Sequence, residues 1–222
     1  MTTLDTKFTC CAVCGEFSDQ TVLGSSNTME PPDLDTRPGE MLRSTIAYWI
    51  YECPHCGYAA PDLEERITDV ADIVRSPEYL SNEGRFLRHV FLLRQLGHFA
   101  EAGWTALHAA WLADDENNPA LAQSNRRLAI ALFKQGKASR QNFMNDPNEE
   151  FALVTDVCRR AGEFDEALST CRAGLQGDNL PPLIEDILRL ELTLIQNRDD
   201  TRHTCAELPE RPEGAQRVAL DE

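Results

Sequence analysis

Two Cys-x-x-Cys-Gly motifs near the N-terminus constrain the fold of this chain more than any other feature. They are Cys11-Ala12-Val13-Cys14-Gly15 and Cys53-Pro54-His55-Cys56-Gly57. Each motif places two thiols three positions apart, and its glycine can adopt the positive φ with which a chain leaves a tight turn around a metal ion. Cys11, Cys14, Cys53 and Cys56 together supply the four sulfurs of a closed tetrahedral site. We therefore expect a zinc ribbon with a structural Zn²⁺ ion.

The first motif has two adjacent cysteines, so its ligand has to be chosen. Cys11 leaves two residues before Cys14, as in the second motif, whereas Cys10 would leave three. We assign Cys11 as the ligand and expect Cys10 to be a spare thiol, because nothing nearby would activate it. His55 lies too close to both neighbouring cysteines to compete as a ligand, and we expect it to be exposed on the turn.

The charge of the chain argues against nucleic acid as the partner. The formal net charge is −16, and acids exceed bases in residues 1–60 (a net of −5) as well as in residues 61–222 (a net of −11). Binding to phosphates rests on an excess of lysine and arginine. Zinc ribbons occur in nucleic-acid machinery, but this balance favours a protein or peptide partner with a basic or neutral segment.

Cysteine usage and the absence of export signals indicate a reducing compartment. The first ten residues contain one lysine and no apolar run, and no stretch approaches the ~18 apolar residues of a membrane span. Eight cysteines in such a chain, four of them in paired motifs, favour metal over disulfides. We expect a cytoplasmic protein without a membrane partner.

The N-terminal module is expected to span residues 1–60. Residues 7–14 alternate as a short strand does, and residues 46–51 are rich in β-branched and aromatic side chains, which is the strongest strand pattern in the chain. Residues 25–40 contain Pro31, Pro32 and Pro38 and read as an extended loop. The module contains too few apolar residues to form an independent hydrophobic core. The bound metal therefore has to stabilise the module in place of such a core.

A helical domain is expected over residues 61–206. Apolar residues recur at helical spacing from Leu63 to Val74, with acids at the front of this first helix (Asp62, Glu64 and Glu65). Further helices are predicted at 84–96, 99–113, 119–136, 149–161, 164–175 and 182–196. The tail, 207–222, lacks periodicity and is expected to be flexible.

Two of the predicted turns share the pattern Gly-x-Phe-x-Glu-Ala, at residues 97–102 and 162–167. Their offset of 65 residues is close to twice the ~34-residue period of a tetratricopeptide repeat. The repeat between them is degenerate. The expected fold is therefore mainly α, with a small β zinc ribbon at the N-terminus followed by a tetratricopeptide-like helical array.

The run YWIYECPHCGYAAPDLEE, together with the N-terminal Cys-x-x-Cys-Gly and the helices that follow, resembles a bacterial family of unknown function. Members of that family join a split zinc ribbon to tetratricopeptide-like helices. The resemblance is strongest over residues 11–60, and it implies Cys11, Cys14, Cys53 and Cys56 as the zinc ligands. The Pro-rich acidic loop and Cys10 depart from the family pattern, and the resemblance implies no activity.

No catalytic residue is predicted. His98 and Glu101 stand three apart at a helix start, where acids are explained by the helix dipole, and the chain has no His-Glu-x-x-His motif, Walker loop or nucleophile elbow. Cys158 and Cys171 fall on expected core faces and are interpreted as small packed hydrophobes.

Trp104, His108 and Trp111 lie on one predicted helix and are candidates for partner binding. They either pack in the core between repeats or line a concave groove of the kind that holds peptides in helical repeats. The favoured function is a non-enzymatic zinc protein that binds a protein or peptide. The alternatives are a nucleic-acid or transcription regulator acting through the ribbon, and a redox sensor using Cys10 beside the zinc thiolates.

Overall fold

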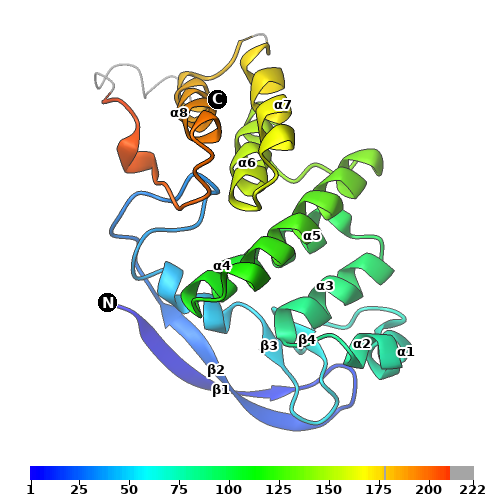
Figure 1. Cartoon of the computed structure of the whole chain (residues 1–222). Helices are drawn as coiled ribbons and strands as arrows, with labels where there is room; N and C mark the ends of the chain where they lie inside the picture. The colour runs from blue at the N-terminus through cyan, green and yellow to red at the C-terminus, as the bar shows by residue number, and fades with distance from the viewer. Residues whose placement is uncertain (178, 211–222) are drawn as a thin grey trace.

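The computed structural model describes residues 1–177 and 179–210. The fold is mainly helical, with small two-stranded sheets at the N-terminus and a helical array after them, as predicted (Figure 1). Over the described ranges, none of the helices is both long enough and apolar enough to cross a membrane.

Two antiparallel hairpins carry the two cysteine motifs. The first pairs β1 (Thr3–Cys10) with β2 (Phe17–Ser25), and the second pairs β3 (Tyr51–Glu52) with β4 (Ala59–Ala60). Each motif forms the turn of its hairpin. The strand predicted at 7–14 therefore begins earlier and ends at Cys10, and its partner β2 was missed because its side chains are mostly exposed.

The strand predicted over residues 46–51 is wrong for most of its length. A 3₁₀ helix, η1 (Arg43–Tyr48), occupies it, and only Tyr51 belongs to a strand. Ile46 and Ile50 are buried in the same core as the helices, a spacing of four that suits a helical turn better than a strand. The Thr45 hydroxyl donates to the Leu42 carbonyl at 2.7 Å and stabilises this turn.

The first predicted helix also begins later than expected. Helix α1 covers only Val70–Arg75, and a short α2 (Pro77–Leu80) follows it. The stretch from Leu63 to Asp69 is not helical, and its first two residues bind the first hairpin instead. The Leu63 carbonyl accepts from the Ala12 N–H at 2.8 Å, and the Glu64 carboxylate pairs with Lys7 at 2.6 Å.

The remaining helices lie where the periodicity predicts them. They are α3 (Arg85–Gln95), α4 (Phe99–Asp115), α5 (Pro119–Ala138), α6 (Pro147–Arg160), α7 (Phe164–Leu175) and α8 (Pro182–Gln196). Proline stands at the start of α5 and α6, and the side chains of Asn118 and Asp146 cap their first turns. Consecutive helices pack against one another along the array (Figure 1).

The two Gly-x-Phe-x-Glu-Ala turns have the same conformation. Gly97 and Gly162 have φ values of 80° and 78°, and Phe99 and Phe164 begin the helices that follow. In each turn the glycine N–H bonds three residues back and the next N–H bonds five residues back, which is a Schellman motif. The shared letters therefore encode a shared helix-to-helix turn.

The core consists of two clusters. The larger one runs through α3 to α8 and includes Leu34 and Ile46 from the segment between the cysteine motifs. The smaller one surrounds Cys11 and Cys53 and reaches α1, α2 and α3 through Val70, Tyr79 and Leu92 as well. The cysteine hairpins are thus packed on the start of the helical array.

The C-terminal segment meets the loop between the motifs. Asp33 forms an isolated antiparallel bridge with Thr204, and the Leu34 N–H donates to the His203 carbonyl at 3.1 Å. Glu207, the first residue of the predicted tail, closes a 3₁₀ turn, η2 (Cys205–Glu207). The part of that tail from 211 to 222 lies outside the described residues.

Candidate metal centre

The four predicted ligand sulfurs converge. All four Sγ atoms of Cys11, Cys14, Cys53 and Cys56 lie within 4.8 Å of one another. The sulfurs of Cys11 and Cys56 are 3.7 Å apart, and so are those of Cys14 and Cys53. These distances join one cysteine of each hairpin, so the group ties the two hairpins together.

The donor set fits zinc. A tetrahedral zinc ion with Zn–S bonds of ~2.3 Å separates its sulfurs by about 3.8 Å, which agrees with the observed spacing. A disulfide would need about 2.05 Å, and all four cysteines are free. Four thiolates complete the tetrahedral shell and leave no position for a reacting water, so the set suits a structural ion.

The two motifs have matching backbone geometry. Gly15 and Gly57 have φ values of 77° and 74°. Their N–H groups donate to the carbonyls of Cys11 and Cys53 at 2.8 and 2.9 Å. In each motif a positive-φ glycine closes the turn and directs both sulfurs to one point, as the sequence pattern predicts.

The local environment shifts the pKa values of three ligand thiols in different directions. Burial raises the pKa of Cys11 and of Cys56 above the ordinary value. Burial also opposes ionisation of Cys53, but the backbone N–H groups of Cys56 and His55 outweigh it and hold the Cys53 pKa below the ordinary value. A metal ion that binds here has to displace protons from buried thiols. The backbone N–H groups of Cys56 and His55 favour this loss of protons, because they stabilise the Cys53 thiolate.

Helices α2 and α3 clamp the second motif. The Tyr79 hydroxyl accepts from the Ala59 N–H at 2.9 Å and donates to the Gly57 carbonyl at 3.0 Å. The His89 Nδ1 atom lies 3.0 Å from the Ala59 carbonyl, and burial lowers the His89 pKa to about 4, so the neutral ring donates there. No pattern in the sequence predicts this clamp, because Tyr79 and His89 follow the second motif by more than 20 positions in the sequence.

Cys10 and His55 lie where the sequence analysis expects them. The Cys10 sulfur is outside the four-sulfur group and contacts the Gly15 carbonyl at 3.6 Å. His55 is exposed on its turn, with Nε2 3.2 Å from the Phe17 carbonyl. Cys158 and Cys171 are fully buried in the helical core, as predicted.

The three partner-binding candidates form an aromatic cluster with Trp49. Trp111 is 2% exposed and donates from Nε1 to Asp35 at 2.7 Å, which favours the packing interpretation for this residue. His108 lies between Trp49 and Trp111, with ring centroids 5.0 and 4.9 Å away, and burial lowers its pKa to about 4. Trp104 is half-buried and donates to the Phe143 carbonyl at 2.8 Å.

Sequence reasoning missed a buried ionic network in the loop between the motifs. The Asp35 carboxylate is completely buried and accepts from Arg160 at 3.0 Å as well as from Trp111. Arg37 reaches Asp115 at 2.6 Å, and Arg43 reaches Asp33 at 2.6 Å. The loop is therefore inserted against α4 and α6, which no local pattern in the sequence predicts.

Comparisons with known proteins return no match, whether the chain is set against protein-family models, curated proteins or solved structures. The resemblance to the bacterial zinc-ribbon family rests on the residues quoted above.

Proposed function

We propose that this chain is a non-enzymatic, structurally zinc-dependent interaction protein whose helical array binds a protein or peptide partner. The observation that carries the proposal is the convergence of four cysteine sulfurs at zinc spacing on two hairpins. Such a shell is closed, so the ion holds the hairpins in place and activates no water.

The helical array supports the second half of the proposal. The turns that lead into α4 and α7 have the same geometry, as repeated units do, and stacked helical repeats bind extended partners along one face. The net charge of −16 favours a partner segment that is basic or neutral. The free cysteines and the paired motifs are consistent with action in the reducing cytoplasm.

Two measurements test the proposal. Elemental analysis of the natively purified protein should find one zinc per chain, and a metal-free but fully folded protein would contradict the structural role. Affinity capture from lysate of the source organism, at low and high salt, should retain a protein partner. Retention of DNA or RNA that is lost at high salt would contradict a protein partner and favour the nucleic-acid alternative.

A further inference from the structure

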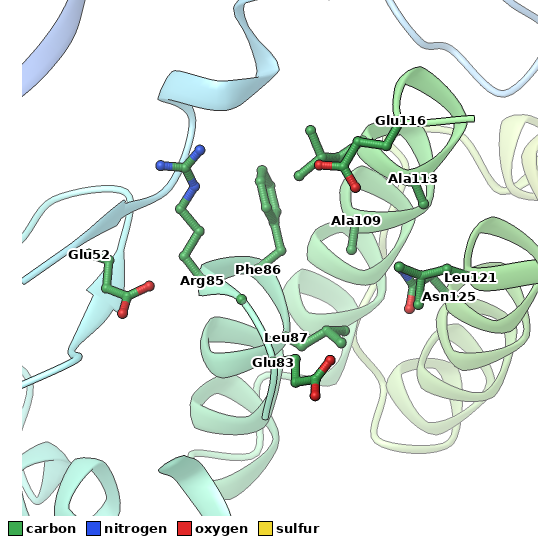
Figure 2. A pocket seen from close by; sticks show the side chains of 12 residues that line it. Glu52, Glu83, Arg85, Phe86, Leu87, Ala109, Ala113, Glu116, Leu121 and Asn125 are labelled. Carbon is green, nitrogen blue, oxygen red and sulfur yellow. The ribbon is translucent and has the colours of Figure 1, made fainter. Parts of the chain in front are cut away.

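A cavity of about 450 Å³ opens between α3, α4 and α5, and Glu52 of β3 also lines it. Its floor is apolar and includes Phe86, Leu87 and Leu112. Figure 2 shows Leu121 and Asn125 projecting from α5 toward Ala109 and Ala113 on α4. This volume falls in the range of ~300–1,000 Å³ that small ligand sites occupy.

Asn125 is the feature that points to a ligand. The residue is 5% exposed and lines the cavity, yet its carboxamide makes no hydrogen bond to any group in the described part of the chain. The amide atoms of Asn125 are not among the buried atoms that lack a partner in the described chain, so water reaches them through the cavity, and a ligand that displaces this water has to replace its hydrogen bonds. A carboxamide offers an acceptor and a donor side by side, and a peptide group presents the complementary N–H and C=O.

The charged side chains at the rim of the cavity determine which charge a ligand can carry there. Glu83 and Glu116 are exposed there and form no ion pair within the described residues, whereas Glu52 is committed to Arg88. One guanidinium, that of Arg85, also stands free at the rim (Figure 2). The free groups are thus two carboxylates against one guanidinium, and they favour a basic group on the ligand.

We propose that this cavity is a peptide-binding site that takes a large apolar side chain next to a lysine or arginine. The apolar side chain fills the floor, the neighbouring backbone amide pairs with Asn125, and the basic group lies against one of the two free carboxylates, Glu83 or Glu116, which stand at opposite ends of the cavity (Figure 2). This inference rests on the proposed function, because it names the segment that the helical array would recognise and the place where it binds.

The test is selection of a phage-displayed library of random seven-residue peptides on the full-length, zinc-loaded protein. Synthetic copies of enriched peptides are then titrated by calorimetry. We expect enriched sequences to place an apolar residue within two positions of a lysine or arginine. Binding should weaken at least tenfold in Asn125→Leu and in the double variant Glu83→Lys/Glu116→Lys. The control Asp19→Lys/Glu30→Lys makes the same charge change at exposed residues outside the cavity and should bind as the parent does.

Folding is checked separately from binding. Leucine has the same branched shape and number of non-hydrogen atoms as asparagine, and its larger methyl groups can extend into the cavity, so Asn125→Leu should melt no lower than the parent. A large fall in its melting temperature would show that the carboxamide serves the fold, and would overturn its role as a ligand group. The rim variant changes only exposed side chains and keeps the test valid in either case.

The outcomes separate the site from the function. Peptides that bind both cavity variants as tightly as the parent would overturn this site and leave the proposed function standing. No enriched peptide at all would overturn this site, and affinity capture then tests the proposed function independently. Self-association that Asn125→Leu abolishes, seen by sedimentation, would show that a second copy of the chain occupies the cavity and would overturn the peptide assignment.

Discussion

Cys10 and Cys11 are adjacent, yet only the Cys11 sulfur faces the other three, because β1 ends at Cys10 and the chain turns there. The neighbouring side chains point in different directions from this position. Two nearly identical substitutions therefore test the choice of ligand at the scale of one residue.

Cys11→Ser should lose most of the bound zinc, whereas Cys10→Ser should keep a full equivalent, because only the first removes a sulfur from the four. Zinc released on denaturation, measured with a chromogenic chelator, gives the stoichiometry. Full retention in Cys11→Ser together with loss in Cys10→Ser would mean that Cys10 is the ligand.

Tyr79→Phe should destabilise the protein by about 1–3 kcal/mol, because it leaves the buried Ala59 N–H and Gly57 carbonyl without their partner. Urea denaturation measures the change. Tyr48→Phe is the matched control, since no hydrogen bond of its hydroxyl is found in the described structure and its loss should cost little. Equal effects of the two variants would contradict the clamp.

At the scale of elements, the loop between the cysteine motifs behaves as part of the helical core. Asp35→Ala should cost about 3 kcal/mol in free energy of unfolding, because it leaves the buried Arg160 and Trp111 groups without this partner. Asp115→Ala removes a carboxylate that is 43% exposed from Arg37 and should cost ~1 kcal/mol or less. Chemical denaturation of both variants compares the costs, and a smaller loss for Asp35→Ala would contradict the anchoring role.

Helices α6 and α8 are joined by a buried group whose protonation changes stability. Arg159 bonds to Asp156 at 2.7 Å and to Glu191 at 2.8 Å, and burial together with the Asp156 charge raises the Glu191 pKa well above the ordinary value. The folded chain thus keeps a proton on Glu191 that the unfolded chain releases above a pH of 4.5. Stability from this group is full below that pH and falls as pH rises.

Glu191→Gln imitates the protonated side chain and should remove this loss. The stability of the variant relative to the parent should grow with pH above 4.5, with a limiting slope of roughly 1.4 kcal/mol per pH unit. Urea denaturation from pH 5 to pH 8 measures it. Glu185→Gln, in an exposed pair with Arg189, is the control, and a pH-independent difference for Glu191→Gln would contradict the raised pKa.

Elements with strong local patterns could be predicted from the sequence, and elements decided by distant contacts could not. Helices α5 and α7 carry apolar periodicity and clear start residues, and their predicted ranges agree with the structure to within two residues. Residues 46–48 have strand-forming side chains, but burial of Ile46 among the helices makes them 3₁₀.

The metal centre could be predicted because the spacing of its four ligands in the sequence is enough to identify them. The cavity at Asn125 could not, since its lining comes from β3, α3, α4 and α5, and no local pattern links them. The same holds for the Asp35 network, whose partner Arg160 stands 125 positions away.

At the scale of the whole molecule, the proposed zinc ion and helices α4 and α6 hold different parts of the N-terminal region. The sulfurs bind the two hairpins, while Asp35, Ile46 and Ile50 are held by the helical core. Removing zinc with a chelator should therefore speed amide exchange in Thr3–Ser25 and around Cys53, with little change in α4 to α7. Hydrogen exchange with mass spectrometry measures this, and uniform loosening of the whole chain would contradict it.

The pairing of the loop at Asp33 and Leu34 with His203 and Thr204 has a consequence for biosynthesis. All four sulfurs leave the ribosome once Cys56 has emerged, so the metal can be captured while most of the helices are still untranslated. The loop between those sulfurs is completed later, because the backbone with which it pairs follows α8 in the sequence. Maturation of the N-terminal region therefore finishes only after helices α3 to α8 have been made.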